Sequence, residues 1–206
     1  MFQGMAPSFG SLSHGKAFID NQKKQEADML LSLIKKTQKG DQESFEKIYD
    51  LFINDIYRYL AVKMSGNDIL DTASEVFFKV WTKINTYSGE SRAQFRAWLF
   101  TIAHNSVVDY YRARRENVSL DDLLELPDTN TDVDPHDMTF KSMSVEILME
   151  GLKKLPKGYE NILTLRFLQD FSNQEIAEIL QMKEGNVRIL VHRAIKKLKE
   201  VVEKRE

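Results

Sequence analysis

The residues with the clearest chemical meaning lie near the C-terminus, in the segment 172–199. Ser172 and Glu175 form the S-x-x-E pattern of a capping box, which opens a short helix, and a turn containing Gly185 follows. The last helix repeats apolar residues at alternating steps of four and three, so the segment has the pattern of a helix-turn-helix. The polar face of such a helix can read base edges in the major groove of DNA and reach its phosphates. The candidate DNA-binding residues on that face are Asn186, Arg188, Ile189, His192, Arg193 and Lys196. The same pattern also fits a solvated helix whose lysines complement its dipole.

A second group combines aromatic and arginine side chains. Residues 85–91 (Asn-Thr-Tyr-Ser-Gly-Glu-Ser) have the composition of a loop, and the aromatic helix that follows ends in an arginine-rich stretch. Unpaired bases stack on aromatic rings while arginines neutralise phosphates, so this combination suits single-stranded nucleic acid. Phe95 and Trp98 keep helical spacing and are expected in the core. Tyr87 belongs to the polar loop and is not expected there.

A third group lies on the helix that starts at Asp68. Asp71, Ser74, Glu75 and Phe78 alternate with the apolar residues of this helix, so they are expected to face outward. An exposed Phe among charged residues suggests a contact with another protein. A solvated helix face explains the spacing equally well.

The sequence offers little for catalysis. It has no Cys, which excludes disulfides, thiolate metal sites and cysteine nucleophiles. No phosphate-binding glycine loop, H-E-x-x-H or G-x-S-x-G motif is present, and the four His residues lack the spacing of metal ligands. We therefore expect no enzyme activity, no metal and no cofactor. No apolar run approaches the roughly 20 residues of a membrane span, and the expected location is the cytoplasm.

The chain that must position these groups has 206 residues, of which 42% are hydrophobic and 29% are charged. Only 9 Gly and 4 Pro occur, so a turn-rich all-β fold is disfavoured and an all-α protein is predicted. Apolar residues at helical spacing predict four helices in one domain, 26–115, with breaks at Gly40, at 65–67 and at 85–91. A second helical domain, 138–206, is predicted to contain the helix-turn-helix.

The remaining segments flank these two domains. Residues 1–25 are predicted to be a disordered tail, and Met1 to Gly4 are interpreted as a non-native addition before a native start at Met5. Residues 116–137 hold eight acidic residues, no basic residues and two prolines, and are predicted to be an acidic linker. The net charge of the whole chain is -2, but charge is unevenly distributed. The second domain is basic, with 13 Lys and Arg against 10 Asp and Glu.

Several short motifs follow one another along the chain in a fixed order. They are Asp71…Ser74-Glu75-Val76-Phe77; Tyr87-Ser88-Gly89-Glu90-Ser91 followed by Phe95-x-x-Trp98-Leu99-x-x-Ile102-Ala103-x-Asn105; Leu155-Pro156; Leu165-Arg166-Phe167; Glu175-Ile176-Ala177-Glu178; Gly185-Asn186-Val187-Arg188; and Arg193-Ala194. In this order they resemble the motifs of the extracytoplasmic-function (ECF) sigma factors, the smallest class of the sigma-70 family of bacterial RNA polymerase subunits. The resemblance covers nearly the whole chain that is predicted to fold.

The resemblance implies that the first domain is sigma region 2 and the second is sigma region 4. Such a protein would bind core RNA polymerase, direct it to promoter DNA, and have an anti-sigma protein as a further partner. Its two domains would separate on binding the polymerase, and the acidic linker would run toward the RNA path. The polymerase-binding residues would be Asp71, Ser74, Glu75 and Phe78. The minus-ten element would be bound, through a flipped base, by Asn85, Thr86, Tyr87, Ser88, Gly89, Glu90 and Ser91, with Asn105 and Arg112 alongside. The minus-thirty-five element would be read by Asn186, Arg188, Ile189, His192, Arg193 and Lys196.

The chain also departs from the family pattern. Ser74 replaces the usual Gln, and Asn186 replaces the usual Thr. Ile189-Leu190 replaces a common Ser-Arg pair, so weaker phosphate binding is expected, while Ile189 could contact a thymine methyl group. The promoter sequence that this chain prefers is therefore not inferred from the family.

Two alternatives stay open at this point. One is a stand-alone helix-turn-helix regulator, which explains residues 156–202 but not the Gly-Glu-Ser loop. The other is a sigma-like polymerase adaptor that does not read promoters. Transcription from a defined promoter would separate the adaptor from a sigma factor.

Overall fold

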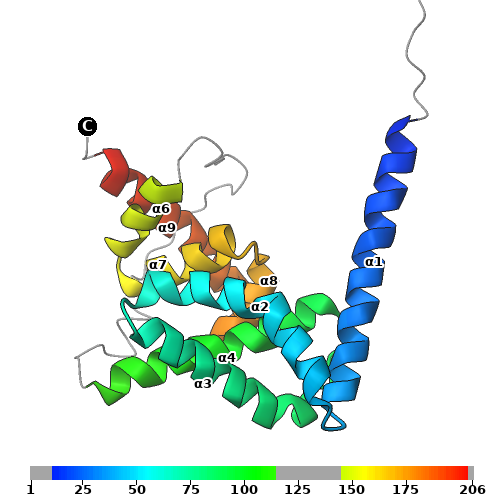
Figure 1. Ribbon diagram of the computed structural model, residues 1–206. Coiled ribbons are helices and arrows are strands. Elements are labelled where there is room, and N and C mark those ends of the chain that lie inside the picture. Colours follow the sequence, from blue (N-terminus) through cyan, green and yellow to red (C-terminus); the bar gives the residue numbers. More distant parts are fainter. Residues whose placement is uncertain (1–10, 115–144, 204–206) are drawn as a thin grey trace, which may run out of the picture.

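The computed structural model describes residues 11–114 and 145–203, and every regular element in these two ranges is helical. The expected all-α fold is therefore confirmed (Figure 1). The predicted acidic linker 116–137, the residues 1–4 and the remainder of the first ten residues lie outside the described residues.

The first half of the protein contains four helices. They are α1 (Ser11–Thr37), α2 (Gln42–Lys63), α3 (Asp68–Lys83) and α4 (Arg92–Ala113). The turns after α1 and α2 contain Gly40 at a φ of +90° and Gly66 at a φ of +68°, a conformation that glycine adopts without steric cost. Helix α1 begins well before the expected start near Glu26, and its N-terminal half projects from the body of the protein (Figure 1).

The core of this half forms where the apolar faces of α2, α3 and α4 meet. Ile48, Phe52 and Ile56 recur every four residues along α2 and are fully buried, because that spacing places them on one face. Phe52 packs on Phe95 of α4, with ring centroids 5.5 Å apart. Phe95 is fully buried, as expected, and Trp98 is half-buried against the same core.

Helix α4 is buried on two sides rather than one. Its expected stripe, which includes Phe95 and Leu99, faces α2 and α3, but Ala97 and Phe100 lie off that stripe and are also buried. Phe100 packs on Phe171 from the second half of the chain, with ring centroids 4.9 Å apart. The second half therefore covers a face of α4 that the helical period alone would leave in water.

The second half contains α6 (Val145–Lys153), α7 (Lys157–Leu163), a π-helical turn η2 (Thr164–Leu168), α8 (Asn173–Leu180) and α9 (Glu184–Glu203). The predicted capping box is present: the Ser172 hydroxyl accepts a hydrogen bond from the Glu175 amide, and the Glu175 carboxylate accepts one from the Ser172 amide. The short α8, the turn and the long α9 form the predicted helix-turn-helix.

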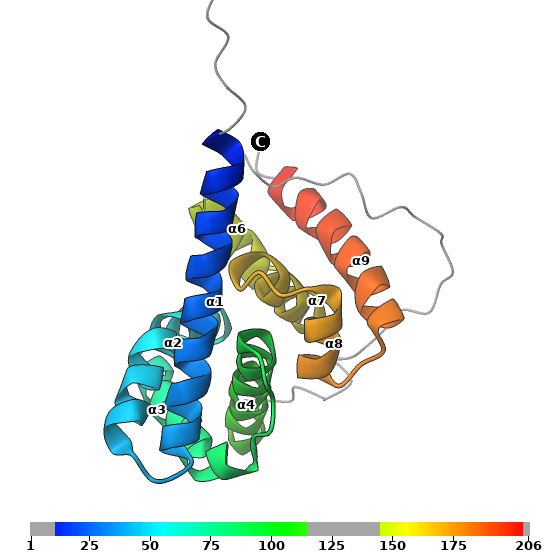
Figure 2. The same ribbon diagram turned by 90° about the vertical axis from the view of Figure 1, so that its right-hand side faces the viewer.

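The two halves pack together into one body. Figure 2 shows α7 and α8 beside α4, and contacts join α4 to α8, and α2 to both α6 and η2. Two domains joined by a linker were expected, and the structure adds that they touch along α4.

Candidate nucleic-acid interface

The first candidate surface is the N-terminal part of α9. Asn186, Arg188 and Ile189 are exposed, and 48% of the Ile189 surface is accessible. The turn before them is fixed by backbone hydrogen bonds, since the amides of Asn186 and Val187 both donate to the Lys183 carbonyl. The start of α9 is therefore presented to solvent by a rigid turn, as major-groove reading requires.

The remaining predicted DNA-binding residues of α9 differ in their exposure to solvent. Lys196 is exposed, whereas His192 and Arg193 are half-buried. Leu190 is 6% exposed and packs in the core with Val187. Position 190 thus points inward in this chain, and the weaker phosphate binding expected from the absence of a basic residue there stays a prediction.

The second candidate surface is the loop 85–91. Tyr87 of this loop was expected to lie outside the core, and the structure shows that it is buried. Its side chain is only 8% exposed and packs edge-on against Phe95 at 5.3 Å, with Trp98 at 5.2 Å. Burial also raises the pKa of the Tyr87 phenol. In this conformation Tyr87 is part of the core, and its side chain anchors the loop to α4. The ring is therefore not accessible for stacking with a nucleic-acid base.

The loop is held in place from both sides. The side-chain amide of Gln38, the residue directly after α1, donates hydrogen bonds to the carbonyls of Ile84, at 3.0 Å, and Tyr87, at 2.8 Å. A Cβ on Gly89 would lie 2.3 Å from the Tyr87 hydroxyl oxygen, so a side chain at this position requires the Tyr87 ring or the loop to shift. Ser91 then caps α4 by accepting a hydrogen bond from the Gln94 amide at 3.1 Å.

Around this loop the polar residues are accessible. Asn85, Thr86, Ser88 and Glu90 are exposed, while Gly89 and Ser91 are half-buried. A hollow of about 270 Å³ lies between the loop and α1. Its lining consists of Leu31, Ile34, Lys35, Gln38, Tyr87, Ser88, Gly89 and Glu90. No part of the sequence reasoning placed α1 at this site.

Asn105 and Arg112 are exposed on α4 but lie far from the loop. Ser91 and Arg112 are at opposite ends of α4, which at 1.5 Å per residue places them roughly 30 Å apart. Both Asn105 and Arg112 line a groove of about 590 Å³. One wall of this groove comes from α3 and α4, and the other from the end of α8, including Leu180 and Gln181. The structure therefore does not gather the predicted minus-ten residues into one pocket.

The third candidate surface is the outer face of α3. Asp71, Ser74, Glu75 and Phe78 are exposed, as predicted, and 67% of Phe78 is accessible. Sequence reasoning missed Leu70, which is 60% exposed; its position four residues before Ser74 and eight before Phe78 was the available signal.

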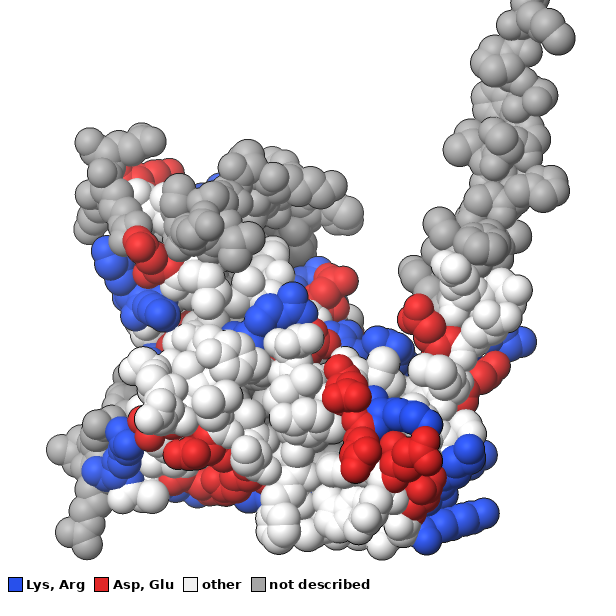
Figure 3. Space-filling model, in the orientation of Figure 1, with Lys and Arg blue, Asp and Glu red and all other residues white. Residues whose placement is uncertain are grey.

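Acidic side chains surround the exposed apolar residues of α3. Glu75 forms an ion pair with Lys79 at 2.7 Å, on the next turn of the same helix. On the side of the molecule drawn in Figure 3, acidic side chains gather over α2 and α3 with uncharged surface between them. Two large exposed apolar residues amid carboxylates fit a partner that offers basic and apolar groups together.

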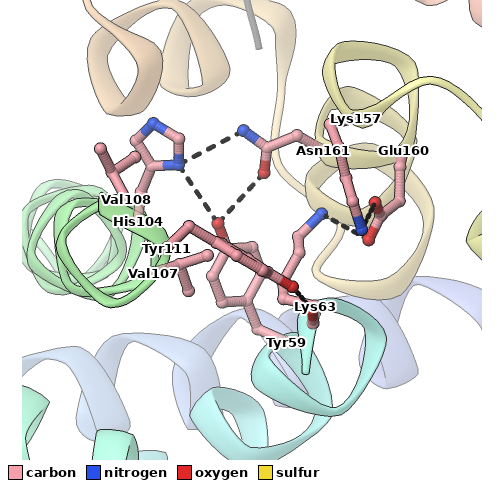
Figure 4. A pocket seen from close by; sticks show the side chains of 9 residues that line it. All are labelled: Tyr59, Lys63, His104, Val107, Val108, Tyr111, Lys157, Glu160 and Asn161. Atoms are coloured by element: carbon pink, nitrogen blue, oxygen red, sulfur yellow. Dashed lines mark hydrogen bonds and ion pairs between the residues drawn. The ribbon is translucent and has the colours of Figure 1, made fainter. Parts of the chain in front are cut away.

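Where the two halves meet, a group of polar side chains is buried (Figure 4). The Tyr59 hydroxyl donates to Asn161 Oδ1 at 3.1 Å, and the Asn161 amide nitrogen lies 3.3 Å from His104 Nδ1. With this orientation Nδ1 accepts the hydrogen bond, so the imidazole is neutral. The Lys63 ammonium pairs with Glu160 Oε1 at 3.3 Å. The other carboxylate oxygen, Oε2, lies 3.1 Å from Lys157 Nζ in an ion pair that lacks hydrogen-bond geometry.

Burial shifts the pKa values of this group. It lowers the pKa of the His104 imidazole to about 4, with a smaller contribution from the Lys63 charge. It lowers the pKa of the Lys63 ammonium to about 8, although the Glu160 carboxylate acts in the opposite direction. It also raises the pKa of the Tyr59 phenol, as does the Glu160 charge. Burial between the two halves thus disfavours a positive charge on both His104 and Lys63.

The described residues show no feature of a metal centre or of membrane insertion. They contain no group of three or more His, Asp or Glu side chains arranged to hold a metal ion. Among the helices of residues 11–114 and 145–203, none combines the length and apolarity needed to span a bilayer.

Known proteins share both halves of this architecture. The family model "Sigma-70 region 2" matches residues 45–117, and "Sigma-70, region 4" matches residues 146–198. An ECF RNA polymerase sigma-E factor from Haemophilus influenzae is 30% identical over 171 residues, covering 79% of this chain and 89% of that protein. The ECF RNA polymerase sigma factor BldN from Streptomyces coelicolor is 29% identical over 170 residues, covering 82% of this chain but only 64% of its relative.

Solved structures show the same fold. The sigma factor RpoE from Bartonella quintana, crystallised with the anti-sigma factor NepR, superimposes with a TM-score of 0.59. The match is 21% identical in sequence and covers 78% of this chain and 98% of that one.

Proposed function

This chain belongs to the ECF class of the sigma-70 family, and we propose that it binds core RNA polymerase and directs promoter-specific initiation of transcription. The observation that carries the proposal is the exposed face of α3. Phe78 and Leu70 lie in water beside Asp71 and Glu75, and binding of a protein partner would remove their apolar surface from solvent. Duplex DNA binding through α9 does not account for this face.

Promoter reading is proposed for two separate surfaces. The exposed start of α9, with Asn186, Arg188 and Ile189, is suited to the major groove of the minus-thirty-five element. Half-buried His192 and Arg193 contribute from the same helix, and Lys196 reaches phosphate.

The minus-ten element is assigned to the loop 85–91 and to the outer face of α4. The exposed loop residues and the hollow beside α1 provide room for an unpaired base. Because Tyr87 is buried, its proposed role is to hold the loop in shape. Arg112, at the far end of α4, is proposed to contact phosphate.

The proposed activity is that of an initiation factor without catalysis of its own, acting in the cytoplasm where polymerase and promoters meet. An anti-sigma protein is proposed as a regulator, because the solved Bartonella quintana sigma factor was crystallised with one. The acidic linker 116–137 is proposed to run toward the RNA path of the polymerase, a role that rests on the family resemblance alone.

The direct test mixes the purified chain with core RNA polymerase and follows run-off transcription on genomic fragments. Stable binding with discrete transcripts supports the proposal. Binding without transcripts favours a polymerase adaptor, and sequence-specific duplex binding without any binding to polymerase favours a stand-alone helix-turn-helix regulator.

A further inference from the structure

Helix α1, together with Gln38 directly after it, turns one face toward the loop 85–91. The residues of this segment that line the hollow are Leu31, Ile34, Lys35 and Gln38. They are spaced three, one and three positions apart, which places them on one side of a helix. The Gln38 backbone amide donates a hydrogen bond to the Ile34 carbonyl at 2.9 Å, so the helical bonding pattern continues through Gln38. One face of this helix therefore forms the wall of the hollow opposite the loop.

The body of the protein fixes this wall in place. Leu30, Leu33 and Ile34 of α1 are buried in the same core as Tyr87 of the loop. Thr37 is also buried, and its hydroxyl donates a hydrogen bond to the Leu33 carbonyl at 2.9 Å. Because close-packed side chains join the wall to the base of the loop, the distance between them is set by the core.

Gln38 binds the loop at two points. Its side-chain nitrogen donates to the Ile84 carbonyl at 3.0 Å and to the Tyr87 carbonyl at 2.8 Å. These two bonds use both hydrogens of the amide group. Among residues 11–114 and 145–203, no other hydrogen bond to the Tyr87 carbonyl is found. Gln38 therefore fixes the path of the backbone where the loop begins.

The far end of the loop is tied to α1 as well. Arg92, the first residue of α4, forms an ion pair with Glu26 of α1 at 3.6 Å. Both side chains reach solvent, so this pair contributes little stability on its own. It shows, however, that α1 runs beside the whole loop, with Gln38 at the start of the loop and Glu26 at its end.

Lys35 brings a positive charge to the hollow. It is exposed, and its ammonium has no ion-pair partner within residues 11–114 and 145–203. An unpaired nucleotide carries a phosphate next to its base, and an ammonium without a carboxylate partner suits that phosphate. Glu90 on the opposite wall offers a hydrogen-bond acceptor to the amino group of a base.

We propose that α1, with Gln38 at its C-terminal end, forms part of the minus-ten site. Gln38 is a positioning residue that holds the loop in the shape that accepts an unpaired base, and Lys35 contacts the phosphate beside that base. This inference rests on the proposed function, because it takes the loop to bind an unpaired base of the promoter. The hydrogen bonds between Gln38 and the loop do not depend on that function.

The effect of Gln38 on the loop can be measured in the free protein through the fluorescence of Trp98. Trp98 packs against Tyr87, with ring centroids 5.2 Å apart, and Trp81→Phe leaves it as the only Trp of the chain. Gln38→Met keeps the length of the side chain but removes both donated hydrogen bonds. It is expected to shift the Trp98 emission to the red and to increase its quenching by acrylamide. Gln25→Met, at an exposed position of α1, is the matched control and is expected to change neither.

Strand opening tests the positioning role. The full chain is assembled with core RNA polymerase on a promoter found by run-off transcription with the parent protein, and opening is followed by permanganate footprinting. Gln38→Met is expected to slow opening about tenfold, which matches the loss of one or two hydrogen bonds of ordinary strength. The affinities for core polymerase and for the closed promoter are expected to stay at parent values. Gln38→Lys, whose ammonium can donate to both carbonyls, is expected to restore most of the rate.

The proposed phosphate contact predicts a change in salt dependence. The probe is a single-stranded oligonucleotide with the minus-ten sequence of the same promoter, bound to the assembled polymerase. Lys35→Ala is expected to lower the slope of log affinity against log salt concentration by about one. Lys36→Ala is the matched control, because Lys36 is exposed on α1 next to Lys35 and does not line the hollow.

Several results would overturn the proposal. Unchanged Trp98 emission or normal strand opening in Gln38→Met excludes the positioning role. So does a Gln38→Lys variant that opens DNA as slowly as Gln38→Met, because the donated hydrogen bonds would then not matter. An unchanged salt slope in Lys35→Ala excludes the phosphate contact. If the parent protein yields no transcripts, the proposed function fails and the minus-ten role falls with it, whereas the Trp98 measurements still decide whether Gln38 holds the loop.

Discussion

Mild acid is expected to open the two halves of the protein, and His104 is the group responsible. Its pKa is about 4 in the closed structure against 6.5 for an exposed imidazole, because it is buried near the Lys63 ammonium. A group with a lowered pKa binds fewer protons in the closed state, so the closed state loses stability as the pH falls through 6.5 toward 4. If opening returns the imidazole to water, the loss at pH 5 is about 2 kcal/mol, or about thirtyfold in the closed-to-open ratio.

Other groups near His104 set the usable range of pH. The charged and titratable side chains that face it or share its groove are Tyr59 and Lys63 of α2, Lys79 and Lys83 of α3, Asp109, Tyr111 and Arg112 of α4, and Lys157 and Glu160 of α7. Lys63, with a pKa of about 8, titrates above neutrality. The window from pH 7 to pH 5 therefore lies below the titration of Lys63 and spans the range in which an exposed imidazole gains its proton.

The assay is energy transfer between dyes on α2 and α9, recorded from pH 7 to pH 5. The parent protein is expected to open progressively, whereas His104→Gln, which cannot gain a proton, is expected to show a flat profile. An equal pH dependence in His104→Gln would refute the reasoning, because the titrating group would then lie elsewhere.

Three further predictions concern the proposed interfaces. Arg188→Ala is expected to weaken promoter recognition by about 1–3 kcal/mol in a duplex-binding assay and to leave polymerase binding intact; an equal loss of polymerase binding would contradict the role of α9. Phe78→Ser is expected to weaken core polymerase binding at least tenfold without lowering the melting temperature, since 67% of the side chain is already in water; a lower melting temperature would make Phe78 a structural residue. Gly89→Ala is expected to slow promoter opening, measured by permanganate footprinting, because its Cβ would lie 2.3 Å from the Tyr87 hydroxyl oxygen; normal opening would show that the loop shape is not needed.

Local features of the fold could be predicted from the sequence because they depend on neighbouring residues. The capping box of Ser172 and Glu175 was predictable from its spacing, and both hydrogen bonds are present. The exposure of Phe78 followed from helical periodicity, and so did the burial of Phe95. The helix-turn-helix pattern indicated DNA binding by α9, whereas the assignment of surfaces to the two promoter elements and to polymerase came from the family resemblance and remains a proposal.

Features that depend on distant pairs were missed. Tyr87 was expected outside the core because its neighbours are polar, but Phe95 and Trp98, one and two turns into α4, close over its ring. The buried hydrogen bond between the two halves joins Tyr59 to Asn161, residues separated by more than a hundred positions, and no local pattern indicates such a pairing. The available signal was Phe100, an apolar residue on the wrong side of α4 for a helix with one buried face.

The central claim is tested most directly by adding the purified chain to core RNA polymerase and measuring run-off transcripts from genomic fragments. We expect a stable complex and discrete transcripts, whose yield falls with Phe78→Ser through weaker polymerase binding and with Arg188→Ala through weaker promoter recognition. A folded protein that binds no core polymerase would contradict the account.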